Sequence, residues 1–358
     1  MDSPLVRYTT TTDGVSIAYW TLGQGPALVI LPTLLYSHLT KEWETPEWRR
    51  AYELLALERT VVRYDGRGTG VAQRDVPDYS SEAMLMDLDA AIGAATGLPV
   101  ALVGNITTAP AAIEYAVRFP ERVSHLILWT PLVDGACLAA NSRFQAARKL
   151  AEVDWSVMCE AVAHDELAWE EQAVARRYAA LMQSSLTRDA VLAQLPVLLE
   201  TNVESLLPQI PCPTLVLHRS QSKALPAGEA ERVAAAIPGA KLALFDGTCT
   251  APFLGDWRPV MRTLAEFLGL DLMKVRTDGG ARALRLLSMK SDALTPRERQ
   301  VVQLVVRGLT NRQIADELFL AEKTVGNHIG RILVKLDLRS RTQLAAYAVE
   351  HGLTSRSA

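Results

Sequence analysis

The sequence of 358 residues lacks the marks of a membrane-embedded, exported or metal-binding protein. Its longest apolar runs, residues 27–31, 126–129 and 214–217, are long enough for strands but too short to span a membrane. The N-terminus has no basic start followed by an apolar core, so we expect no signal peptide. The four cysteines are isolated and show no metal-ligand spacing. We therefore expect a cytoplasmic protein with reduced thiols, no membrane contact and no cofactor.

Basic and acidic residues are distributed unevenly, although the net charge is only −3. Residues 274–358 hold 15 Lys and Arg against 8 Asp and Glu, a net charge of +7. Residues 1–273 hold the remaining 22 and 32, a net charge of −10. A basic C-terminal part suggests a polyanionic partner, although a solvated basic face has the same charge.

Strand-like and helix-like segments alternate in residues 1–131, become purely helical in residues 132–208, and alternate again from residue 214. This order predicts an α/β fold with a mostly parallel sheet and a helical cap over residues 132–210. We place this domain at residues 1–269, a linker at 270–292 and a compact all-helical unit at 293–358. The predicted strands are residues 5–10, 15–21, 27–31, 60–64, 100–103, 123–129, 214–217 and 241–245.

A strand, a sharp turn and a helix follow one another at residues 100–119, as in the nucleophile elbow G-x-S-x-G. Gly104 stands at the first glycine of this motif, and Thr108 stands at the second. The serine position is occupied by Ile106, which cannot attack a carbonyl group. We expect either a relaxed turn at Ile106 or a strained backbone that its surroundings compensate.

Further motifs, spread over about three quarters of the chain, support the same fold as the elbow. They are Asp13-Gly-Val-Ser-Ile-Ala-Tyr, Gly25-Pro-Ala-Leu-Val-Ile-Leu-Pro, Val62-Arg-Tyr-Asp-Gly-Arg-Gly-Thr-Gly, Phe119-Pro-Glu-Arg-Val and Pro213-Thr-Leu-Val-Leu-His. Together with the elbow, they resemble the α/β-hydrolase fold with a helical cap. The resemblance implies an active site beneath the cap, with a triad in the order serine, aspartate or glutamate, histidine.

This sequence lacks the three catalytic residue types that the resemblance implies. The three positions are occupied by Ile106, Ser222 and Thr250. None of the six histidines lies between His218 and His328, so the base is missing in any register of the last strand. We therefore expect that the protein is not an enzyme. The alternative is a hydrolase with a non-standard nucleophile, for which Thr107, Ser37 and Cys249 are the candidates, or a body that serves only as a dimerisation scaffold.

A cleft without catalytic groups favours binding of a small, largely apolar ligand between sheet and cap. Five tryptophans, Trp43, Trp48, Trp129, Trp155 and Trp169, are possible walls, and we expect two of them to line the cleft. The predicted ligand-binding residues are Leu34, Asn105, Ile106, Thr107, Trp129, Trp155, Ser222 and Thr250.

The C-terminal part contains two capping boxes, one starting at Thr295 with Pro296 and Glu298, the other at Thr310. Two short helices, a tight turn at residues 319–321 and a longer helix at 322–336 predict a helix-turn-helix. Leu294-Thr-Pro-Arg-Glu, Gly308-Leu-Thr-Asn-Arg-Gln-Ile-Ala and Lys323-Thr-Val-Gly-Asn-His resemble the LuxR-type (NarL/FixJ) DNA-binding domain.

This resemblance implies that the third helix enters the major groove of double-stranded DNA. Asn327 or His328 would then reach base edges. Leu344 and Ala348 of the fourth helix would pair two domains in a homodimer. Gly326 and Gly330 depart from the family pattern and cost the helix about 1 kcal/mol each relative to alanine. The residues expected to hold phosphates are Arg312, Lys323, Thr324, Arg331, Lys335 and Arg339.

These observations lead to one hypothesis: a ligand-responsive transcription regulator, in which an inactive hydrolase-like domain senses a small molecule and the C-terminal domain binds DNA.

Overall fold

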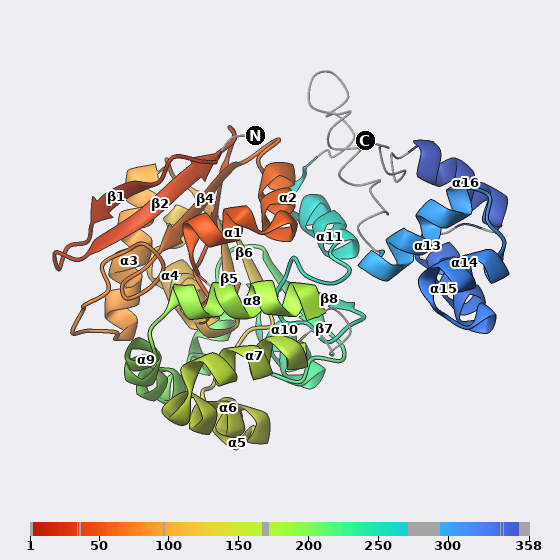
Figure 1. Cartoon of the computed structure of the whole chain (residues 1–358). Helices are drawn as coiled ribbons and strands as arrows, with labels where there is room; N and C mark the ends of the chain where they lie inside the picture. The colour runs from red at the N-terminus through yellow and green to blue at the C-terminus, as the bar shows by residue number, and fades with distance from the viewer. Residues whose placement is uncertain are drawn as a thin grey trace. The chain divides into compact units, whose positions relative to one another are not determined.

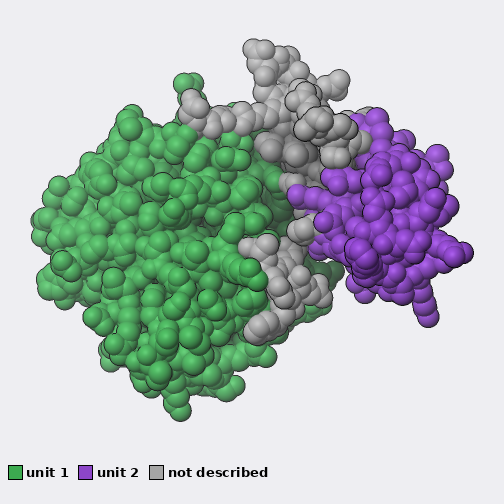
Figure 2. Space-filling model, in the orientation of Figure 1, with its two compact units in different colours: residues 1–275 green, residues 276–358 purple. Residues whose placement is uncertain are grey.

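The computed structural model describes residues 3–270 and 294–350, apart from residues 34, 36, 96, 167–171, 337 and 339. The chain divides into two compact units, residues 1–275 and residues 276–358, which Figure 2 shows in different colours. The predicted linker at residues 270–292 lies almost entirely outside the described residues.

The first unit is built on an eight-stranded sheet with the order β1-β2-β4-β3-β5-β6-β7-β8 (Figure 1). β2 pairs antiparallel with both β1 and β4, and the pairs from β4 through β8 are parallel. The predicted α/β class is therefore confirmed. The strands are β1 (Arg7–Thr10), β2 (Ser16–Leu22), β3 (Ala27–Ile30), β4 (Thr60–Asp65), β5 (Val100–Asn105), β6 (Val123–Trp129), β7 (Thr214–Arg219) and β8 (Lys241–Phe245).

Successive strand residues point to opposite faces of the sheet, and helices cover both of these faces (Figure 1). One face packs its apolar side chains against α3 (Ser81–Ala95), α4 (Ala109–Arg118) and α10 (Ala227–Ala236). On the opposite face, Trp20 of β2 contacts Tyr52 of α2, and His125 of β6 contacts Phe267 of α11. The helices on this side are α1 (Leu39–Glu44), α2 (Pro46–Leu55) and α11 (Arg258–Leu268).

A helical insertion connects β6 to β7. It has its own apolar core, which includes Leu138, Leu186 and Leu195 and packs against Ile106 of the elbow. Hydrogen bonds anchor it to the loop after β4: the Arg74 guanidinium donates to the carbonyl oxygens of Ser184 (2.7 Å) and Ser185 (2.9 Å). Its helices are α5 (Ala136–Ala140), α6 (Ser142–Val153), α7 (Trp155–Glu166), α8 (Gln172–Ser185) and α9 (Arg188–Glu200).

The second unit is all-helical, with α13 (Pro296–Val306), α14 (Asn311–Leu318), α15 (Glu322–Leu336) and α16 (Arg341–Glu350). Both predicted capping boxes form, at Thr295 and at Thr310. Phe319 ends α14 in a left-handed conformation (φ 54°) and is 95% exposed. Within the described part of the chain, no helix combines the length and apolarity that a membrane crossing requires.

Candidate functional site

The turn after β5 has the predicted strand–turn–helix geometry. β5 ends at Asn105, and a single 3-10 turn, Ile106–Thr108, leads into α4. A Cβ on Gly104 would lie 2.9 Å from both Ala109 Cα and Ala112 Cβ, so only glycine lets the helix pack this closely on the strand. The Asn105 N–H donates to Thr108 Oγ1 at 3.1 Å, which closes the turn.

Ile106 has a φ of 36°, in the left-handed region that β-branched residues rarely adopt. Of the two outcomes expected for this position, the structure has the strained backbone. The Leu132 N–H donates to the Ile106 carbonyl oxygen at 3.2 Å, and the half-buried side chain packs against the core of the helical insertion. The elbow thus presents a hydrocarbon side chain at the position where a hydrolase has its nucleophile.

A cavity of about 350 Å³ lies over this turn. Its lining comes from α5 to α9, from the elbow, and from the loops that follow β3, β7 and β8. Most of the wall is apolar, and a volume in this range suits a small organic ligand. The larger apolar side chains of the wall include Phe144, Met158, Val162, Tyr178, Leu195 and Leu198.

The structure brings three of the predicted ligand-binding residues to this cavity, Ile106, Thr107 and Thr250. Leu34 lies outside the described residues. Asn105 is buried, and its side-chain amide donates to the Leu31 carbonyl oxygen (3.3 Å). Asn105 and Ser222 are not among the described lining residues, although Lys223 and Ala224, which follow Ser222, are.

The prediction that two tryptophans line the cavity is wrong for the tryptophans that the structure describes. Trp129 lies behind the wall, where its indole N–H donates to the Thr250 carbonyl oxygen and its ring stacks on Phe245. Trp155 packs within the insertion, and Trp43 is buried against Trp20 of β2. Trp48 is buried and stacks on the wall residue Tyr178, but it is not itself among the described lining residues. Trp169 lies outside the described residues. The aromatic wall residues are instead Phe144 and Tyr178.

Thr250 occupies the place where the resemblance puts the catalytic histidine, and it bonds a carboxylate. Glu166 Oε2, at the end of α7, accepts hydrogen bonds from the Thr250 N–H (2.6 Å) and the Thr250 hydroxyl (2.5 Å). Burial raises the pKa of Glu166, and these two hydrogen bonds only partly oppose it.

The loop that carries Thr250 is held from the sheet side by a buried arginine. Arg219 donates to the carbonyl oxygens of Asp246 (2.9 Å), Leu254 (2.9 Å) and Asp256 (3.1 Å). Its guanidinium also lies over the Trp129 ring, 5.8 Å from the centroid. These contacts span both sides of Thr250 and fix its position in the cavity wall.

Charged residues from three separate segments meet at the same cavity. Arg143 of α6 and Lys223 after β7 lie 2.5 Å and 3.0 Å from the same oxygen, Asp165 Oδ1. Partial burial alone would raise the pKa of Asp165, but hydrogen bonds from both cations lower it. Sequence reasoning missed this cluster because no spacing links positions so far apart along the chain.

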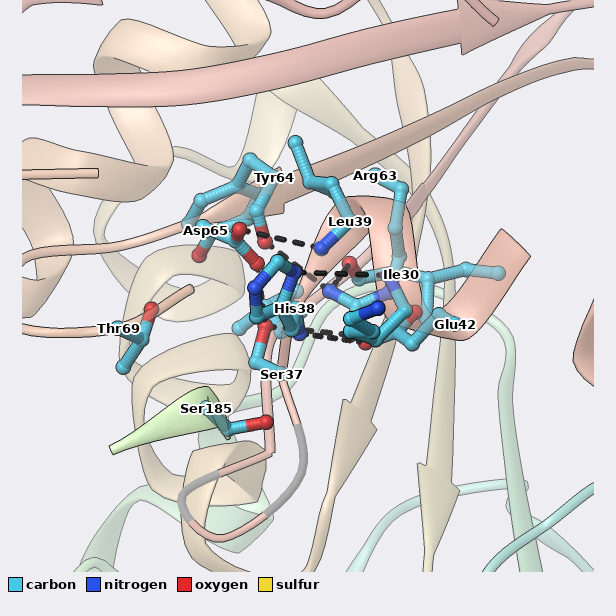
Figure 3. A network of polar contacts seen from close by, with 12 residues as sticks. Ile30, Ser37, His38, Leu39, Glu42, Arg63, Tyr64, Asp65, Thr69 and Ser185 are labelled. Carbon is cyan, nitrogen blue, oxygen red and sulfur yellow. Dashed lines mark hydrogen bonds and ion pairs between the residues drawn. The ribbon is translucent and has the colours of Figure 1, made fainter. Parts of the chain in front are cut away.

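A second polar network supports the loop after β3 (Figure 3). The buried Asp65 carboxylate accepts from the Ser37 hydroxyl (3.0 Å) and from the N–H groups of Leu39 (3.1 Å) and Val71 (2.9 Å). Beside it, Arg63 pairs with Glu42 at 2.6 Å. This network orders the loop that supplies Thr33 and Leu35 to the cavity. Ser37, a candidate nucleophile in the enzyme alternative, is thus engaged with Asp65 away from the lining.

The helix α15 separates a buried face from a polar one, as predicted. Val325, Ile329, Ile332 and Leu336 are buried in the core of the second unit. The described side chains on and beside the opposite face are exposed at Arg312, Lys323, Asn327 and Arg331, and half-buried at Thr324 and His328. The side chain of Lys335 and the whole of Arg339 lie outside the described structure.

Leu344 and Ala348 do not form a pairing surface. Both are fully buried in the core of their own domain, where α16 packs against α13. The prediction that they join two domains is therefore wrong, because their stripe is already used within one domain. The described part of α16 exposes Ala346 and the larger apolar residue Val349, which is 62% exposed.

Residues 292–348 match the family described as bacterial regulatory proteins, luxR family. The same region is 54% identical over 57 residues to the DNA-binding transcriptional activator DevR/DosR of Mycobacterium tuberculosis, covering 16% of this chain and 26% of that protein. The chain spans about a quarter to a third of the length of the first curated relatives that it matches.

The remaining part of the chain is similar to solved hydrolase structures. An esterase from Exiguobacterium antarcticum superposes with a TM-score of 0.64 at 18% identity, over 73% of this chain and 98% of the esterase. A hydrolase from Pseudomonas aeruginosa gives a TM-score of 0.63 at 22% identity, over 74% of this chain and 98% of that protein. Identities this low show the fold alone. The chain thus joins a domain of the α/β-hydrolase fold to a C-terminal LuxR-type helix-turn-helix domain.

Proposed function

We propose that the protein is a DNA-binding transcription regulator whose hydrolase-fold domain binds a small, largely apolar ligand and does not convert it. The observation that carries the proposal is the occupant of the elbow. Ile106 keeps the left-handed backbone of a nucleophile position, yet its side chain has no atom that can attack a substrate. It forms part of the wall of a cavity large enough for a ligand.

The other two triad positions support the same interpretation. Thr250 stands in place of the base, and its hydroxyl is engaged with Glu166. Ser222 stands in place of the acid and does not belong to the described lining. Since loss of one triad member already removes most of the rate of such an enzyme, loss of all three argues against acyl transfer.

The C-terminal domain supplies the DNA-binding half of the proposal. In it, α15 lies in the major groove, where the exposed Asn327, or His328 beside it, reads base edges. Arg312, Lys323 and Arg331 are exposed and hold phosphates, and Thr324, Lys335 and Arg339 extend this set. The protein binds as a homodimer through the outer face of α16, where Val349 is exposed.

The DNA-binding half is tested by selecting duplexes from a random-sequence pool with the full chain. We expect an enriched, two-fold symmetric site of two half-sites, bound with a steep salt dependence. Arg331→Ala is expected to weaken binding to every duplex. Arg307→Ala, which removes an exposed positive charge just after α13 and outside the proposed contacts, is the matched control. Enrichment of no sequence, or equal binding by both variants, contradicts the proposal.

Of the three candidate nucleophiles of the enzyme alternative, Thr107 belongs to the described lining, whereas Ser37 and the buried Cys249 do not. The Glu166 carboxyl is a further polar group of that lining. Hydrolysis of p-nitrophenyl butyrate by wild type, Thr107→Val and Glu166→Gln separates the two functions. We expect no turnover above buffer. Turnover that scales with protein concentration and is abolished by either substitution would establish the alternative.

A further inference from the structure

Two cations share one carboxylate oxygen in the cavity lining. Arg143 comes from the start of α6, Asp165 from the end of α7, and Lys223 from the loop after β7. The Arg143 Nη1 and Lys223 Nζ atoms lie 2.5 Å and 3.0 Å from Asp165 Oδ1. Asp165 alone neutralises only one of these two charges, so the three-residue cluster has a formal charge of +1; the neighbouring Glu166 adds a second carboxyl group to the lining.

The same sign holds for the described lining as a whole. It contains three cations, Arg143, Arg148 and Lys223, and two carboxyl groups, Asp165 and Glu166. Glu166 Oε2 already accepts hydrogen bonds from the Thr250 N–H and hydroxyl. A cationic excess is notable here, since residues 1–273 carry a net charge of −10.

The positions of the cations suit a charged group that stays partly in water. The side chains of Arg143 and Lys223 are 55% and 37% exposed, and that of Asp165 is 35% exposed. A ligand anion at this point keeps part of its hydration, which avoids the high cost of burying a charge. The remaining wall, with Phe144, Met158 and Leu195, offers apolar surface that excludes water.

We infer that the ligand is an amphiphile with a hydrocarbon body and a single carboxylate, and that Arg143 and Lys223 hold this carboxylate. The inference rests on the proposed ligand-binding function and specifies its ligand class. The planar guanidinium of Arg143 suits a two-pronged hydrogen bond to a carboxylate, and the Lys223 ammonium adds a point charge beside it. The ligand carboxylate competes with Asp165 for both cations, so binding loosens the link between α6, α7 and the loop after β7.

Isothermal titration calorimetry of the full chain tests this ligand class. The probes are decanoate, methyl decanoate and decylammonium, which share one hydrocarbon chain and differ in head-group charge, each used below its micelle concentration. We expect decanoate to bind about tenfold or more tightly than the other two probes, as expected for hydrogen bonds to a charged group.

Variants then locate the head group. Arg143→Gln and Lys223→Gln are each expected to weaken decanoate binding about tenfold and to leave methyl decanoate binding unchanged. Lys149→Gln is the matched control, because Lys149 is an exposed cation on the same helix and lies outside the described lining. Far-ultraviolet circular dichroism confirms that each variant is folded.

The outcomes separate this inference from the proposed function. Equal affinity for decanoate and methyl decanoate overturns the carboxylate site but leaves an apolar ligand-binding cavity. Equal loss of decanoate affinity in Lys149→Gln also overturns it, since the effect is then one of overall charge. Binding of none of the three probes overturns the proposed ligand class, whereas the DNA-binding half of the proposed function is tested by duplex selection alone.

Discussion

Replacing Ile106 by alanine and by glycine tests whether the elbow stores backbone strain. At an ordinary site the alanine variant is more stable by about 0.5–1 kcal/mol, because glycine loses more backbone entropy on folding. At Ile106 the backbone is left-handed, with a φ of 36°. This conformation costs a residue with a Cβ atom about 1–2 kcal/mol. Both variants lose the apolar side chain, but only the alanine variant keeps the Cβ. We therefore expect the glycine variant to be more stable by about 0.5–1 kcal/mol.

The seven tryptophans make this measurement specific to one domain. All of them lie between Trp20 and Trp257, so tryptophan fluorescence in a urea titration reports the unfolding of the hydrolase-fold domain. Glu114 of α4 is the matched control site. Its alanine and glycine variants both lose the ion pair with Arg118, and there alanine should be more stable by about 1 kcal/mol. The same order at both sites would refute the strain at Ile106.

Gly104→Ala should destabilise the domain by about 1–3 kcal/mol through its clash with α4, whereas Gly93→Ala, which meets no atom within 4 Å, should not destabilise it in the same urea titration. Burial raises the pKa of Glu166 in the folded state above the ordinary glutamate value. The stability that protonated Glu166 contributes is therefore present below the ordinary glutamate pKa and is lost as the pH rises through the folded-state pKa. Glu166→Gln should therefore melt higher than wild type at neutral pH and equally at acidic pH; an advantage at both pH values would contradict this. Arg331→Ala should reduce the salt slope of DNA binding by about one, because it removes one phosphate contact. Asn327→Ala should relax the base preference by about 1–3 kcal/mol at one position of the site. If both substitutions weakened binding to all duplexes equally, the assigned roles would be wrong.

Most elements of the fold could be predicted from periodicity and from turn residues. The bounds of β6 and β8 agree with the predicted strands, and both capping boxes form at the predicted positions, Thr295 and Thr310. The helix α1 (Leu39–Glu44) was not predicted, because six residues are too few to show a helical period.

The site was less predictable, because a linear pattern does not show which side chains face one cavity. Ile106 and Thr250 could be placed, since the elbow and the last strand are marked by local motifs. The prediction that tryptophans line the cavity was wrong, because a large aromatic side chain fills a core as readily as a pocket. Trp129 is buried in the core. The Arg143–Asp165–Lys223 cluster forms only when α6, α7 and the β7 loop come together.

The hypothesis of a ligand-responsive regulator requires that a ligand in the cavity changes DNA binding, and the affinity of the full chain for its selected duplex tests this most directly. The dissociation constant is measured with and without saturating decanoate, once calorimetry has established that decanoate binds. A ligand that distinguishes two states of the protein should change this constant by about fivefold or more. Equal dissociation constants with the cavity empty and filled would contradict the account.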